Sequence, residues 1–190
     1  KEYGRLTVLN QMLGGHDADG NYVNDLTFSK RFLLDMGERL EKLDYKEIRA
    51  YELEGKGHVG PYLDGTTFDP MAGVLDAMGN NPDAALDFLA KPGAVPDGSR
   101  SGGDMSRLYD LSKREMGDQG FAGLTAAIAA GASKRSSEDS TEVNRADDLS
   151  GHAIHYLALN AKEDLYNNSS KVHVAMLLAD CSAEVTGVWN

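Results

Sequence analysis

Apolar residues recur at helical spacing along almost the whole chain, and no stretch alternates in the way that a half-buried strand does. The clearest segment is 28–43, where the apolar positions return every three to five residues over about four turns. Charged residues fill the rest of that segment, as in an amphipathic helix that lies on a core. The spacing therefore predicts an all-α fold, an irregular bundle of about seven to nine helices.

One pattern is stated twice in the stretch FDPMAGVLDAMGNNPDAALDFLAKPG, residues 68–93. Asp69 and Asn81 are good N-cap residues, because their side-chain oxygens can accept hydrogen bonds from free amides of the first turn. Pro70 and Pro82 follow them, at the first helical position, where the missing N–H costs nothing. Gly79 is a natural helix end. The stretch predicts a corner of two short helices at 69–90.

Further helices are expected around 3–13, 105–116, 121–132, 141–162 and 170–188. Gly117 and Gly120 should interrupt the helical structure between 105–116 and 121–132. The helix at 170–188 is apolar on most of its circumference, which predicts a central position in the bundle. Glycine and proline mark 55–65 and 91–104 as loops, and we expect the second to be flexible.

Length and charge narrow the class of protein. A chain of 190 residues fits a single helical domain, 1–190, and we expect it to be a segment of a longer protein because it opens without an initiator methionine. The net charge of -11 argues against a nucleic-acid partner and against adsorption to anionic membranes, since both need a basic face. No apolar run is long enough to predict membrane insertion.

The single cysteine, Cys181, excludes an internal disulfide and a cysteine-based zinc cluster. Because it lies in an apolar helix, we interpret it as a buried structural thiol. The compartment stays open: the chain could be cytoplasmic or exported without disulfides.

Three histidines are the candidate metal ligands. His152 and His155 are three residues apart, so on a helix they share a face, and His173 could approach from the last helix. The alternative is one histidine at the core edge with an exposed neighbour, which we favour because the HExxH arrangement is absent. The DADGN stretch at 17–21 fails the EF-hand pattern and is better explained as a turn.

No motif identifies catalytic or cofactor-binding residues. His58 and Lys56 lie in a glycine-rich stretch that lacks the spacing of a phosphate-binding loop. No GxSxG nucleophile elbow occurs. Trp189 is better explained as a packing group than as a ligand platform. We therefore predict no catalytic residue and no cofactor.

Five segments together resemble one family, in the order YGRLTVLNQML, FSKRFLLDMGERLEKLD, DPMAGVLDAMGNNPDAALDFL, MSRLYDLSKREMGDQGFAGLTAAIAAGAS and VHVAMLLADCSAEV. It is an uncharacterised family of long, mostly helical actinobacterial proteins that are often associated with small helical modules of the type VII secretion kind. The resemblance is most specific at 69–89 and 108–132. Met116 stands where the family pattern leads us to expect tryptophan, which affects local packing. The resemblance implies a helical fold and a secretion-associated setting, with no catalytic residues to transfer.

Three functions compete. The favoured hypothesis is a non-enzymatic scaffold or interaction domain that binds a protein partner or forms a homo-oligomer. The second is an effector or toxin-like enzyme, which requires some of the histidines to converge in one pocket. The third is a metal- or ligand-binding helical module.

Overall fold

The computed structural model describes residues 4–14, 26–53, 69–93 and 103–181, and these are mainly helical, which confirms the all-α prediction. The described residues form nine α-helices, within the predicted number. The α-helices are α1 Gly4–Leu13, α2 Lys30–Leu40, α3 Tyr45–Leu53, α4 Met71–Met78, α5 Pro82–Leu89, α6 Ser106–Ser112, α7 Gly117–Ala132, α8 Ser140–Asn160 and α9 Asn168–Asp180. The shorter elements are η1 Ser133–Ser136, η2 Glu163–Leu165, β1 Lys91–Pro92 and β2 Gly103–Asp104.

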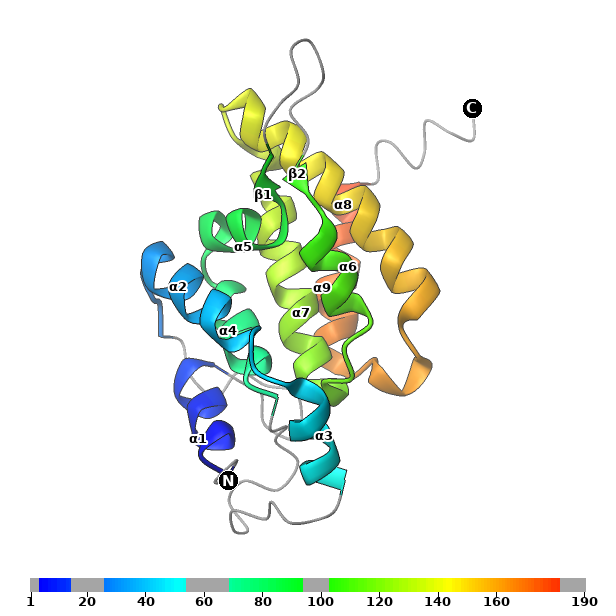
Figure 1. The fold of residues 1–190 in the computed structure, drawn as a ribbon. Helices are drawn as coiled ribbons and strands as arrows, with labels where there is room; N and C mark the ends of the chain where they lie inside the picture. The colour runs from blue at the N-terminus through cyan, green and yellow to red at the C-terminus, as the bar shows by residue number, and fades with distance from the viewer. Residues whose placement is uncertain (1–3, 15–25, 54–68, 94–102, 182–190) are drawn as a thin grey trace.

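Helix α7 is the centre of the bundle, and twelve of its sixteen residues are buried. Helices α4, α5, α8 and α9 all pack against it. In Figure 1, α2, α4 and α5 lie on one side of α7, while α8 lies on the other side and α9 lies behind. Helices α1 and α2 form an outer layer over α4, and α2 also covers α5. The core therefore surrounds α7 and α4.

Two glycines allow α4 to touch its neighbours closely. A Cβ on Gly123 of α7 would lie 2.7 Å from the carbonyl oxygen of Ala72 and 3.1 Å from the amide nitrogen of Asp76. A Cβ on Gly73 of α4 would lie 2.5 Å from Cα of Asn10 in α1. These distances are shorter than van der Waals contact, so both helix pairs meet backbone to backbone. All eight residues of α4 are buried as a result.

The corner of two short helices is present as predicted. Asn81 Oδ1 accepts a hydrogen bond from the Ala84 amide at 3.0 Å, and the proline after Asn81 starts α5. Asp69 Oδ1 accepts from the Met71 amide at 2.9 Å, but the N-cap of α4 is Pro70, so Asp69 and Pro70 each lie one position earlier relative to the helix than predicted. Helix α4 ends at Gly79, but with φ -56 this glycine keeps a right-handed helical conformation. The predicted cap at Asn81 is therefore confirmed, the predicted cap at Asp69 is shifted by one residue, and the corner has no left-handed turn.

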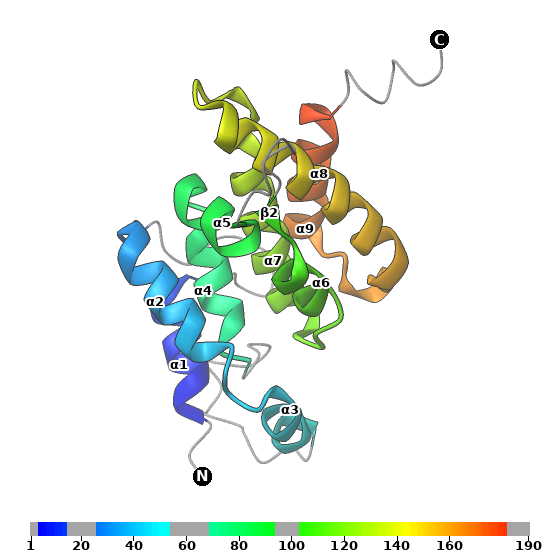
Figure 2. The same ribbon diagram turned by 45° about the horizontal axis from the view of Figure 1, so that its top comes forward.

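The prediction that the last helix is central is wrong. Only Ser170, His173 and Leu177 of α9 are buried, and they face α7. In the rotated view of Figure 2, α9 lies on the side of α7 that faces away from α4. The apolar circumference of this helix therefore faces outward over much of its length. The predicted helix continued to residue 188, and the residues beyond Cys181 lie outside the described part of the chain.

Two boundaries also differ from expectation. Helix α2 ends at Leu40, and a separate helix, α3, follows where no helix was assigned. Gly120 lies inside α7, while Gly117 starts it with a φ of +70, a conformation that favours glycine. The break before α7 therefore depends on Gly117 alone.

A short antiparallel pairing closes the loop predicted at 91–104. Lys91 is paired with Asp104 and Pro92 with Gly103, so the two ends of the loop lie side by side. Residues 94–102 lie outside the described part of the chain, so the expected flexibility of this loop stays a prediction.

Candidate functional site

The three candidate metal ligands lie in different environments. His152 and His155 are exposed on α8, and both rings lie beside Tyr156, with centroid distances of 5.5 and 5.7 Å. His173 is 9% exposed and faces inward from α9. Within the described ranges, no three His, Cys, Asp or Glu side chains are grouped as a metal ion would require.

His173 belongs to the contact between α7 and α9. Its Nδ1 lies 3.3 Å from Oγ1 of Thr125, whose hydroxyl donates to the carbonyl of Ala122 at 2.9 Å. Burial lowers the pKa of His173 below its ordinary value of 6.5, and a hydrogen bond with the backbone of Ala122 offsets part of this effect. A neutral imidazole at this position joins two helices, which is a structural role.

Cys181 is buried, as predicted, and lies at the C-terminal end of α9. Arg135 Nη1 lies 3.4 Å from its sulfur and donates to the carbonyl of Asp180 at 2.6 Å. The guanidinium thus caps the C-terminus of α9, where a positive charge is favourable. The other candidates, His58, Lys56, Trp189 and the stretch 17–21, lie outside the described residues.

The most buried ion pair among the described residues joins segments 45 residues apart in sequence. Arg114 Nε donates to Asp69 Oδ2 at 2.6 Å and Nη2 donates to Oδ1 at 2.9 Å, a bidentate arrangement. Their side chains are 7% and 6% exposed. The Arg114 guanidinium also lies over the ring of Tyr45, 4.6 Å from its centroid. Asn10 donates to the Asp69 carbonyl at 2.8 Å, so this cluster ties α1 and α3 to the start of α4.

A second buried arginine holds the end of α5. Arg145 of α8 donates to the carbonyl oxygens of Ala90 and Leu86, at 2.8 and 3.2 Å. Its Nη2 also donates to Asp87 Oδ1 at 2.8 Å. Burial alone would raise the pKa of Asp87, but its contacts with Arg145 and Lys30 together lower it. These atoms satisfy free carbonyls of a helix end, so their role is structural.

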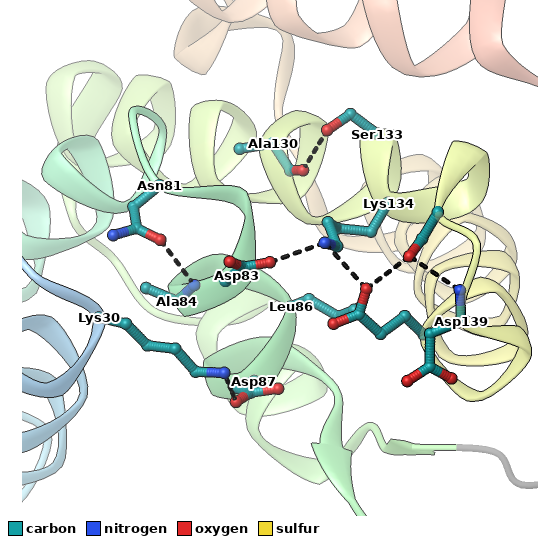
Figure 3. Close-up of polar contacts among 12 residues, drawn as sticks. Lys30, Asn81, Asp83, Ala84, Leu86, Asp87, Ala130, Ser133, Lys134 and Asp139 are labelled. Atoms are coloured by element: carbon teal, nitrogen blue, oxygen red, sulfur yellow. Dashed lines mark hydrogen bonds and ion pairs between the residues drawn. The ribbon is translucent and has the colours of Figure 1, made fainter.

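The opposite end of α5 carries a more exposed network (Figure 3). Lys134 Nζ lies 2.7 Å from Asp83 Oδ1 and 2.8 Å from Glu142 Oε2. Hydrogen bonds to these two carboxylates raise the pKa of Lys134. The network joins η1 to the first turns of α5 and α8, where carboxylates are favourable. Most described buried charges therefore connect helices, and the described histidines do not converge in one pocket.

The outward face of α9 is the largest departure from this well-satisfied interior. Val172, Met176 and Leu178 are 57%, 54% and 46% exposed, although each is a large apolar side chain. Val172, Ala175, Met176 and Ala179 recur at helical spacing and so share one face, which Leu178 borders. No charged residue occurs from 172 to 179. We call these five residues the α9 outer face; contiguous exposed apolar surface of this kind marks interaction sites.

The sequence pattern revealed the apolar residues of this face but assigned them to the core. A pattern that is apolar on most sides predicts burial on most sides, and it contains no signal for the side that stays uncovered. The buried ion pair between Asp69 and Arg114 was missed, because the sequence explained Asp69 as a helix cap and gave no signal that pairs it with Arg114.

No described helix is both long enough and apolar enough to span a bilayer. No curated protein and no solved structure matches the chain. One family model does match, over residues 1–190, and its description is a family of unknown function, DUF6571. This match over the full length agrees with the resemblance to an uncharacterised family that the helical segments indicated. The chain belongs to the DUF6571 family.

Proposed function

We propose that this chain is a non-enzymatic helical interaction domain whose α9 outer face binds an amphipathic helix of a protein partner. The observation that carries the proposal is the exposure of Val172, Met176 and Leu178 on a helix whose opposite side packs on the core. Leaving such a face in water forgoes about 25 cal/mol for every Å² that a partner could cover. A partner that covers it gains this free energy.

The dimensions of the face favour a helix as the partner. Helix α9 has 13 residues and is therefore about 20 Å long. An amphipathic helix of three to four turns matches this length and reads such a face through residues at helical spacing. A second copy of the chain is less suitable, since stable symmetric interfaces bury about 800 Å² on each side, more than one exposed helix face provides.

The net charge of the chain also favours a partner helix over a second copy. Each copy carries a net charge of -11, so two copies repel each other at long range. A helix with an apolar seam and basic flanks is attracted instead. We extend the proposal to a secretion-associated, actinobacterial setting, for which the support is the resemblance of the helical segments to that class of proteins.

A matched pair of variants tests the proposal. Leu178→Glu places a charge on the α9 outer face, and Leu159→Glu makes the same change on α8, where Leu159 is 68% exposed. The probe is a fluorescent peptide of about 14 residues in which leucine and lysine alternate at helical spacing, long enough to cover the face. A peptide with the same composition in scrambled order controls for charge alone.

We expect the amphipathic peptide to bind the wild-type chain more tightly than the scrambled peptide does in fluorescence anisotropy. Leu178→Glu should weaken this binding roughly ten-fold, and Leu159→Glu should leave it unchanged. Equal loss in both variants would rule out the α9 outer face as the binding surface. A discrete oligomer in native mass spectrometry that Leu178→Glu dissociates would show instead that a second copy occupies the face.

A further inference from the structure

A cavity of about 370 Å³ lies between the α2–α3 corner and α6, and no residue of α9 lines it. Arg107, Asp110 and Leu111 of α6 line one wall together with Arg114, which follows the helix. Glu41 and Tyr45 line the opposite wall, and Lys113 stands at the exposed edge. The volume is within the range of small-molecule sites.

Two of the cations in this cavity are already neutralised. Arg114 forms the bidentate pair with Asp69, and Arg107 Nε lies 2.7 Å from Glu41 Oε2. Arg107 is further fixed by its bond to the Phe88 carbonyl, at 2.8 Å, and by its position over the Phe88 ring. Both arginines are thus held in place by groups on other elements. A ligand would meet oriented donors and would not have to order them.

Two further charged side chains line the cavity, the carboxylate of Asp110 and the ammonium group of Lys113. Asp110 forms no side-chain hydrogen bond or ion pair with another described residue. The Lys113 ammonium contacts only the neutral hydroxyl and ring of Tyr109 within the described residues. Arg114 Nη1 and the Tyr45 hydroxyl also donate to no described residue. The cavity therefore offers several donors and one free carboxylate, with no net charge among its lining pairs.

We propose that this cavity binds a small zwitterion of the α-amino acid or short-peptide class. The ligand's carboxylate accepts from Lys113 and Arg114, and its ammonium group donates to Asp110. The charges of the lining cancel when Asp69, the partner of Arg114, is included, so a ligand without net charge is favoured and each of its charges meets an opposite charge. A phosphate-like dianion would add negative charge to a chain that already carries -11. Leu111 provides the apolar contact for the ligand's side chain.

Three probes that share a phenyl group separate the two charged contacts. Phenylalanine carries both charges, 3-phenylpropanoate lacks the ammonium group, and phenethylamine lacks the carboxylate. Binding to the purified chain is followed by amide chemical shifts in NMR titrations. The same titrations are made with the other standard amino acids. We expect phenylalanine, or one of these amino acids, to change the amide chemical shifts of residues 107–114. The matching single-charge analogues should bind at least roughly ten-fold more weakly, as loss of a charged hydrogen bond implies.

Two exposed substitutions assign the contacts without disturbing the buried ion pairs. Asp110→Asn should weaken amino-acid binding roughly ten-fold and abolish the preference over 3-phenylpropanoate. Lys113→Gln should reduce the preference over phenethylamine, with Arg114 left as the donor to the carboxylate. Glu115→Gln, a neighbouring exposed acid outside the cavity lining, is the control and should change nothing. The proposal is overturned if no amino acid shifts these amides, or if a single-charge probe binds as tightly as the zwitterion.

Discussion

Helices α7 and α9 both contain many apolar residues but lie in opposite environments. Twelve residues of α7 are buried, and helices cover it on several sides. Only three residues of α9 are buried, all toward α7, although most of its other side chains are also apolar. The two helices differ in how closely neighbouring elements can approach them. Helix α7 has glycines at its contact points, while α9 presents larger side chains on its outer face.

This contrast shows that apolar content determines whether a helix packs, while side-chain size determines on how many sides it packs. Gly123 and Gly131 each leave room for a neighbour's backbone or side chain that a methyl group would displace. Close approach on several sides places α7 in the centre. Helix α9 has no glycine and covers one side of α7 only.

The largest difference is expected when one apolar side chain is shortened on each helix. Leu124→Ala removes a side chain that is 1% exposed in α7 and should lower the free energy of unfolding by about 2–5 kcal/mol. Met176→Ala removes a side chain that is 54% exposed in α9 and should change it by less than about 0.5 kcal/mol. Urea titrations followed by circular dichroism measure both. Equal losses would mean that the α9 outer face is buried in solution.

A smaller effect is expected from adding one methyl group to a glycine. Gly123→Ala forces the new Cβ against the carbonyl oxygen of Ala72 and should destabilise the fold by about 1–3 kcal/mol. Gly151→Ala, on the exposed side of α8, meets nothing within 4 Å and should stabilise it by about 0.4–1 kcal/mol. Thermal unfolding of the two variants should therefore shift in opposite directions. A neutral Gly123→Ala would contradict the backbone contact between α4 and α7.

The smallest effect concerns pH and the contact between the two helices. Because burial lowers the pKa of His173 in the folded chain, the unfolded chain binds a proton there first as pH falls below about 6.5. The free energy of unfolding therefore falls from that pH down to the lowered folded pKa, and it is unaffected above it. His173→Gln should remove this part of the pH dependence.

The measurement is a set of urea titrations of both chains between pH 7.5 and about 5.5, since carboxylates contribute equally to the two and cancel in the difference. His152→Gln, which alters an exposed histidine on α8, is the control and should follow the wild-type curve. If His173→Gln and wild type lose stability in parallel, the imidazole does not resist protonation at the helix contact.

The sequence predicted the elements that carry local signals. The corner at 69–90 was found because caps, prolines and a terminal glycine act within one turn. Helix α3 was missed because only Ile48 of its described side chains is buried, so no apolar stripe marks it. A local signal was nevertheless present: Asp44 Oδ1 accepts from the amides of Lys46 and Glu47, and an acid with Glu47 three residues later resembles a capping box.

Contacts between segments that are distant in sequence could not be predicted from local signals. The pairing of Asp69 with Arg114 depends on how the residues just before α4 and just after α6 approach each other, and neither segment contains that information alone. The same limit applies to the cavity, whose lining comes from the α2–α3 corner and α6. The order of segments indicated an uncharacterised family, which the family match confirms, whereas the actinobacterial and secretion-associated setting stays a prediction. The metal hypothesis for His152, His155 and His173 depended on spacing, and spacing does not determine which side of a helix faces the core.

The two-residue pairing between β1 and β2 has a consequence for engineering. Lys91 and Asp104 are held next to each other, and Arg145 binds the carbonyl of Ala90 just before them. Helices α5 and α6 are thus connected independently of the length of chain between the strands. The entropy of closing a loop rises only slowly with its length, by about 0.6 kcal/mol for each doubling. An epitope or a small reporter domain inserted there should leave the helical bundle intact.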